Sequence, residues 1–198
     1  VNSIETPSHD ITVVEFSLDL NPKRTDDSGN VSKTFWPFLA QLRYRVEVGE
    51  QLTATLTVSN QDSQEFSYSA ALHSYFSVNH INNVIISGFS KTTYVDAVDA
   101  WKEKKQVDDI AFNKEVDRIY KSAPTAIVLS DRNRIVEIAS EGSKSTVVWN
   151  PWIEKSRQLP QFADDEYQSM VCIETANVLD DIISLNPGET HSLALTIA

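Results

Sequence analysis

The feature that most constrains the fold of this chain is a period-two alternation of apolar and polar residues. Residues 11–20, 38–48 and 52–58 all follow it, and Val14 and Phe16 are typical members of the apolar set. Alternation places the apolar side chains on one face of a β-strand and leaves the other face in water. Strands with one wet face are typical of antiparallel sheets rather than of parallel sheets covered on both sides.

Further short apolar runs extend this pattern to the end of the chain. We expect strands at residues 66–72, 84–86, 127–129, 135–138, 147–149, 170–173 and 191–197. So many short strands, with almost no helical periodicity, indicate an all-β sandwich or barrel. No internal repeat or boundary divides the sequence, so we expect a single domain over residues 1–198.

Three polar segments interrupt the strand pattern. Residues 21–34 predict a loop, and residues 101–106, within a charged stretch, predict a helical turn. Residues 152–167 predict a long connection without regular structure, of the kind that often carries function.

Composition excludes several classes of partner. The 198 residues include 28 acidic and 17 basic side chains, for a net charge of −11. Such a surface repels phosphate backbones and anionic lipids, so we expect neither a nucleic-acid nor a membrane partner. The single cysteine excludes an intramolecular disulfide and a cysteine-rich metal site. With no membrane span or signal peptide in view, we expect a cytoplasmic protein.

Two titratable residues lie in unusually apolar surroundings. His73 is flanked by apolar and aromatic residues, where a histidine is either a hydrogen-bonded core residue or a catalyst. Glu174 ends the apolar run 170–173, so it is either an edge residue in water or a buried carboxylate with a function. Together they suggest acid/base chemistry without a cofactor. His9, His80 and His191 are expected to be exposed.

Other signatures of chemistry are weak or missing. Trp149 and Trp152 flank a turn and can serve the core or stack on a sugar. The acidic run 164–166 lacks the spacing of a calcium loop. We find no nucleophile motif, no phosphate-binding glycine loop and no His/Cys set spaced for a metal, so no metal site is expected.

Six segments, in order, resemble the glucose-6-phosphate 1-epimerase (hexose-6-phosphate mutarotase) branch of the aldose 1-epimerase family. The central one is Ala-Leu-His-Ser-Tyr-Phe at residues 71–76. The others lie at residues 88–96, 115–120, 147–152, 164–167 and 170–177, the last being Met-Val-Cys-Ile-Glu-Thr-Ala-Asn. The resemblance covers essentially the whole chain, and it is the combination of motifs that makes it specific.

The resemblance implies a fold, a reaction and roles for particular residues. The fold would be a large antiparallel β-sandwich of the galactose mutarotase type. The reaction would interconvert the α and β anomers of an aldose, here a hexose 6-phosphate. His73 would be the general acid and Glu174 the general base, while Asp117, Trp149 and Asn150 would bind the sugar or sugar phosphate. No cofactor or metal would take part.

The resemblance also implies that the chain lacks the family's N-terminal third, with a second histidine and the arginines expected to hold phosphate. Arg43, Arg45, Arg118, Lys155 and Arg157 remain, mostly at positions expected to be exposed. Two alternatives stay open: a sugar-binding β-sandwich that does not catalyse, and a glycosidase or lyase using Asp117 and Glu174 as paired carboxylates.

Overall fold

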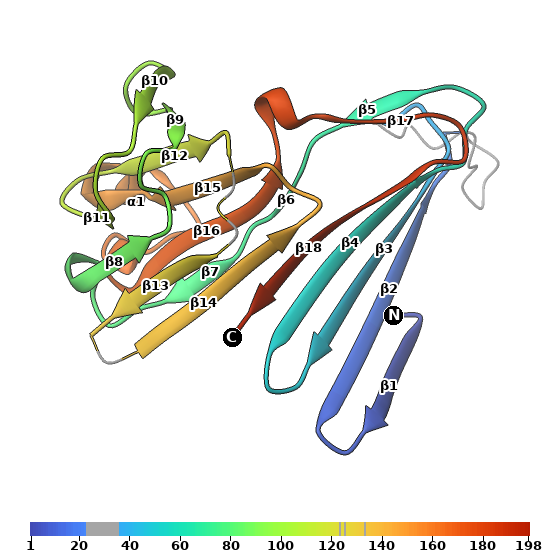
Figure 1. Ribbon diagram of the computed structural model, residues 1–198, viewed down its shortest axis with the longest axis horizontal. Coiled ribbons are helices and arrows are strands. Elements are labelled where there is room, and N and C mark those ends of the chain that lie inside the picture. Colours follow the sequence, from blue (N-terminus) through green and yellow to red (C-terminus); the bar gives the residue numbers. More distant parts are fainter. Residues whose placement is uncertain (23–35, 123, 125, 133) are drawn as a thin grey trace.

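The computed structural model describes residues 1–22, 36–122, 124, 126–132 and 134–198. The loop expected at residues 21–34 therefore lies almost wholly outside the described residues. In the described part, nearly all regular structure is antiparallel β-sheet (Figure 1), as the alternation predicted. No helix there combines the length and the hydrophobicity needed to cross a membrane.

The larger sheet has nine strands among the described residues, in the order β1-β2-β3-β4-β18-β14-β13-β8-β11. Neighbouring strands are antiparallel throughout, and β2, β3 and β4 form a long meander. The strands are β1 (Ser3–Ser8), β2 (Ile11–Leu20), β3 (Ala40–Val48), β4 (Leu52–Asn60), β18 (Thr190–Ile197), β14 (Arg134–Glu141), β13 (Ile127–Asp131), β8 (Val84–Ser87) and β11 (Ile110–Ala111).

The second sheet has seven strands in its described part, with β16 pairing both β6 and β7 at one side. The rest of the order is β10-β9-β12-β15-β16. Its strands are β10 (Lys102–Lys105), β9 (Thr93–Asp96), β12 (Val116–Tyr120), β15 (Ser145–Asn150), β16 (Met170–Asn177), β6 (Ala70–Leu72) and β7 (Tyr75–Ser77). A small separate pair joins β5 (Phe66–Tyr68) to β17 (Ile183–Leu185).

The main core lies between these two sheets. Leu129, Ile138 and Leu195 come from the nine-stranded sheet, and Val148 and Ile173 from the seven-stranded one. All five are buried. Because side chains alternate along a strand, the residues on either side of Ile173 point to the opposite face of the seven-stranded sheet. That outward face carries the candidate site.

Two expectations about the irregular segments were wrong. Residues 102–105 form strand β10, which pairs with β9, rather than a helical turn. The connection after β15 is not without regular structure, since it contains helix α1 (Trp152–Gln158) and the 3₁₀ turn η2 (Glu166–Ser169). Two further 3₁₀ turns are η1 (Ile81–Asn83) and η3 (Leu179–Asp181).

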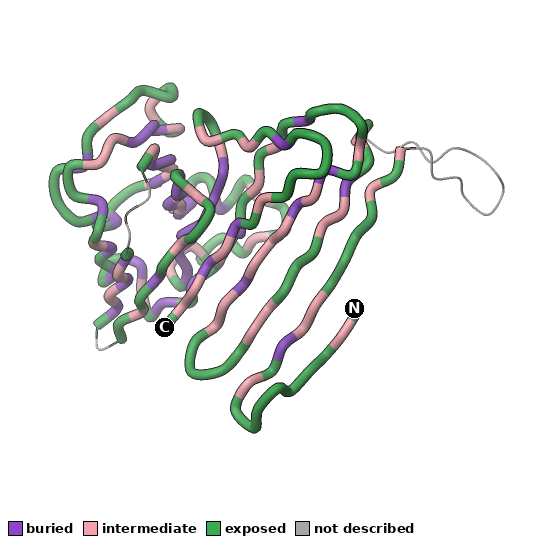
Figure 2. Tube along the Cα trace, turned by 45° about the vertical axis from the view of Figure 1, so that its right-hand side comes forward, coloured by how far each residue is buried: buried purple, intermediate pink, exposed green. Residues whose placement is uncertain are grey.

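The nine-stranded sheet is packed at one end and open at the other. Strands β1 to β4 extend beyond the two-sheet core (Figure 1), and most of their residues are exposed or half-buried (Figure 2). A second small core is formed by Ala40, Val58, Phe66 and Leu185.

Candidate functional site

The site is built on a row of facing residues across four strands of the seven-stranded sheet. Asp117 on β12 lies opposite Trp149 on β15. Trp149 in turn lies opposite Cys172 on β16, and Cys172 lies opposite Tyr75 on β7. Antiparallel pairing puts facing residues on the same side of a sheet, so these side chains share the outward face. Glu174 follows two residues after Cys172 and so shares that face.

The two candidate acid/base residues are in direct contact. His73 lies between β6 and β7, and its Nε2 is 3.2 Å from Oε1 of Glu174. The Glu174 side chain is only 8% exposed, whereas that of His73 is 49% exposed. The edge position in water that the sequence left open for Glu174 is therefore excluded, because β16 is a central strand.

Aromatic rings hold the histidine in place. The His73 imidazole stacks on the Tyr75 ring, with centroids 4.8 Å apart and planes 15° apart. Trp149 meets both rings edge-on, and Phe162 in turn meets Trp149 edge-on. His73 and Glu174 therefore lie beside an aromatic wall formed by Tyr75 and Trp149. Aromatic rings of this kind can pack against the apolar face of a sugar.

Burial and a neighbouring negative charge raise the pKa of the Glu174 carboxyl group. Burial, followed by the negative charge of Asp117, raises the pKa of Glu174 to about 7. The pKa of Asp117 is itself raised, mainly by burial and then by Asp96, while Lys155 acts in the opposite direction. A carboxyl group that exchanges its proton near neutral pH is suited to general acid/base catalysis.

Asn150, expected to bind substrate, holds the turn that follows β15. It is fully buried, and its Nδ2 donates hydrogen bonds to the carbonyl oxygens of Tyr167 and Met170 at 2.8 and 2.9 Å. Its Oδ1 accepts one from the backbone N–H of Trp152 at 3.0 Å. These bonds fix the turn, and a contact between Asn150 and a substrate stays a prediction.

The fold also brings together groups whose sequence spacing gave no sign of a site. Cys172 is buried beside the pair, and the ligand atoms of His73, Cys172 and Glu174 all lie within 4.8 Å of one another. Burial, followed by the charge of Glu174, holds the pKa of the Cys172 thiol well above its usual value. The only sequence signal for this neighbour was its two-residue spacing from Glu174.

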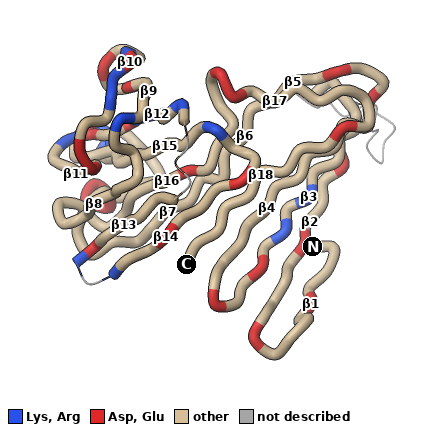
Figure 3. The backbone as a smooth tube through the Cα atoms, viewed as in Figure 1, with Lys and Arg blue, Asp and Glu red and all other residues tan. Residues whose placement is uncertain are grey.

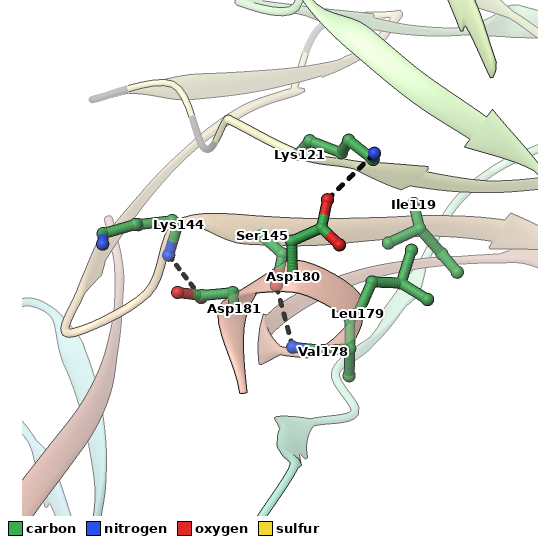
Figure 4. A pocket seen from close by; sticks show the side chains of 8 residues that line it. All are labelled: Ile119, Lys121, Lys144, Ser145, Val178, Leu179, Asp180 and Asp181. Atoms are coloured by element: carbon green, nitrogen blue, oxygen red, sulfur yellow. Dashed lines mark hydrogen bonds and ion pairs between the residues drawn. The ribbon is translucent and has the colours of Figure 1, made fainter. Parts of the chain in front are cut away.

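A separate hollow of about 160 Å³ lies towards one end of β12, β15 and β16. Its charged lining comprises Lys121, Lys144, Asp180 and Asp181 (Figure 4). Lys121 pairs with Asp180 at 2.9 Å and also with Glu103, so its charge is already balanced within the protein. Along the described backbone, Lys and Arg positions lie on several separate elements (Figure 3). Arg118 is one of the arginines considered above for binding phosphate. Its guanidinium group lies over the Tyr94 ring and donates a hydrogen bond to Gln106.

Comparison with known proteins agrees with this architecture. The family model for aldose 1-epimerase matches residues 4–198. A protein of Cenchrus ciliaris named "Putative glucose-6-phosphate 1-epimerase" is 38% identical over 162 residues, which cover 78% of this chain and 49% of that protein. An Escherichia coli K12 protein of the same name is 32% identical over 148 residues, covering 73% of this chain and 49% of that protein.

A solved structure shows the same fold. The crystal structure of "a putative mutarotase (YeaD)" from Salmonella typhimurium superposes with a TM-score of 0.85 at 26% identity, covering all of this chain and 63% of that one. The chain thus spans about half the length of the curated relatives it matches. With matching family model, relatives and fold, the chain belongs to the aldose 1-epimerase family.

Proposed function

We propose that the protein interconverts the α and β anomers of an aldose by acid/base catalysis, with His73 and Glu174 as the reacting pair. The observation that carries this proposal is the 3.2 Å separation between His73 Nε2 and Glu174 Oε1. The ring oxygen and the anomeric hydroxyl of a sugar are bonded to the same carbon. An acid and a base that serve both oxygens must therefore lie close together, as these two side chains do.

The reaction follows from the two proton positions. The Glu174 carboxylate takes the proton of the anomeric hydroxyl, while protonated His73 gives a proton to the ring oxygen. The bond between C1 and the ring oxygen breaks, and the open-chain aldehyde forms. Rotation about the C1–C2 bond presents the other face of the carbonyl, and reclosure with both proton transfers reversed yields the other anomer.

We propose a hexose 6-phosphate as the substrate, because two relatives of the chain carry glucose 6-phosphate in their names. Asp117 and the aromatic wall of Tyr75 and Trp149 would hold the sugar ring. Among the described residues near the site, Lys155 is a cation whose charge acts on Asp117. It is exposed on α1, where it can turn towards a phosphate group.

The test is anomer exchange of glucose 6-phosphate and of glucose, followed by NMR at equilibrium. The 198-residue chain and a longer form that spans the full length of the curated relatives should both be measured. We expect H73N and E174Q each to lower the exchange rate of the active form by about 10²–10⁴-fold, the usual contribution of one acid or base. The matched controls H9N and E154Q, at exposed positions, should leave it unchanged. If no form of the protein exceeds the buffer rate, the proposal is wrong.

The aromatic wall also favours a second candidate, a sugar-binding module without catalysis. Calorimetric titration with hexoses and hexose phosphates separates the two. Binding without exchange supports the module, whereas loss of exchange with retained binding in E174Q supports the enzyme.

A further inference from the structure

His73, Cys172 and Glu174 bring together three side chains of types that bind metals, in a group that the sequence did not reveal. Their nitrogen, sulfur and oxygen atoms lie no more than 4.8 Å from one another. His73 Nε2 and Glu174 Oε1 are 3.2 Å apart. Sequence spacing missed the set because His73 and Cys172 are far apart in the chain and meet only through the pairing of β16 with β7.

The composition of this set matches the preference of zinc. Zn²⁺ binds thiolate, imidazole and carboxylate at about 2.0–2.3 Å, and often uses three protein ligands with a fourth position open. In a tetrahedron with such bonds, ligand atoms lie about 3.3–3.6 Å apart. The histidine–glutamate pair already has this separation, so the cluster needs side-chain movements of about an ångström at most.

The fold holds two of these three side chains on a rigid strand and the third on an exposed connection where its ring can adjust. Cys172 and Glu174 lie on the central strand β16, whose backbone pairs on both sides. His73 lies on the connection between β6 and β7 and is half exposed, so its ring can turn towards an ion while still contacting Tyr75. Asp117, on the same face, adds negative charge that favours a cation.

We propose that His73, Cys172 and Glu174 bind one zinc-type divalent cation, and that the bound ion inhibits the protein by occupying its acid/base pair. The thiol proton passes to solvent as the sulfur bonds to the metal. The inhibitory role rests on the proposed function, whereas binding of the ion does not.

Cadmium is the probe for the sulfur ligand, because a thiolate bonded to Cd²⁺ gives an ultraviolet charge-transfer band. We expect the band to saturate at one equivalent of Cd²⁺ and to be absent in C172S. Zn²⁺ titrated by calorimetry should bind at least about 10-fold more weakly to C172S and to H73N. H9N serves as the control at an exposed histidine and should bind as the wild type does.

Two results would overturn the metal site: no charge-transfer band in the wild type, or equal zinc affinity in the wild type and in H73N. The second comparison does not depend on C172S folding, because His73 is half exposed. The inhibitory role has its own test, in which zinc is added to the NMR exchange assay and then removed with a chelator. If the charge-transfer band appears but zinc leaves the anomer-exchange rate unchanged, the metal site stands and its inhibitory role is refuted. If the exchange rate falls with zinc and recovers with the chelator, both the site and the inhibition are supported.

Discussion

At the scale of single residues, Glu174 is held in an environment that suits a reaction better than it suits stability. Its carboxylate is buried beside Cys172 and repelled by Asp117, and its contact with His73 offsets only part of that cost. Proteins tolerate such costs mainly where a functional site needs the group. The cost should therefore be measurable by removing the charge.

We predict that E174Q is more stable than the wild type at alkaline pH. The pKa of Glu174 rises from an ordinary 4.5 to about 7 on folding, so the folded state holds this proton more tightly than the unfolded state. The stability that the proton brings is complete below pH 4.5 and is lost as the pH rises through about 7. A neutral glutamine suffers no such loss, which amounts to about 3 kcal/mol at most.

Chemical denaturation of both proteins at about pH 5 and about pH 8 checks this prediction. The advantage of E174Q should be about 1–3 kcal/mol at the higher pH and should shrink towards zero at the lower one. E154Q, at an exposed position on α1, should show no pH-dependent difference. An E174Q protein that is less stable than the wild type at both pH values would contradict the proposed origin of the raised pKa.

At the scale of elements, the turn between β14 and β15 fixes how the two sheets meet. Gly142 in this turn has φ +69°, and a Cβ there would lie 1.9 Å from the carbonyl oxygen of Ser192 on β18. Its own carbonyl oxygen accepts hydrogen bonds from Asn177 Nδ2 and His191 Nε2, both at 2.9 Å. His191, expected to be exposed, thus ties β18 to this turn, and its Nδ1 also contacts the Tyr68 hydroxyl at 3.0 Å.

We predict that G142A lowers the free energy of unfolding by more than about 3 kcal/mol, because it combines left-handed strain with a backbone collision. G188A is the matched control. Its φ is +82°, yet a Cβ there has no atom within 4 Å, so it should cost only about 1–2 kcal/mol. Thermal or urea unfolding of the two variants measures the difference. Equal losses would show that Ser192 does not constrain the turn.

The sequence predicted those strands that have one apolar face and missed those that do not. Strands such as β2 and β4 alternate cleanly and were predicted within about two residues. β12 was not predicted as a strand, because Asp117 and Arg118 put polar groups on both of its faces. β10 is a charged edge strand, and such edges avoid the apolar pattern that would reveal them. Helix α1 has only seven residues, too few to show a helical period.

The same reasoning explains what was predictable about the site. His73 and Glu174 stood out because a polar residue in an apolar run is costly, and the fold brings them into contact. The two-residue spacing placed Cys172 on the same face as Glu174, but Tyr75 could not be placed beside Cys172 from the sequence, since that proximity depends on the register between β7 and β16. Asn150 was expected to bind substrate, which stays a prediction, and only the structure shows that its hydrogen bonds to the backbone fix a turn.

At the scale of the whole molecule, the alternation that predicted the sheets also produces an uncovered apolar surface. Phe16 faces Tyr44 across β2 and β3, and Leu18 faces Leu42. Phe16, Leu18 and Tyr44 are 39%, 52% and 37% exposed, although their positions in the pattern are those of core residues. Contiguous apolar surface of this kind promotes association in water.

We predict that the double variant F16T/L18T reduces this association without unfolding the chain. Threonine suits a β-strand, and neither side chain belongs to a buried core, so the loss in stability should stay below about 1 kcal/mol. Light scattering and the fluorescence of a dye that binds apolar surfaces should both decrease. The control S17T changes the opposite face of the same strand and should alter neither signal. Unchanged light scattering in F16T/L18T would mean that association starts elsewhere, for example at β1, which pairs only with β2 among the described strands and therefore forms an edge that can recruit another strand.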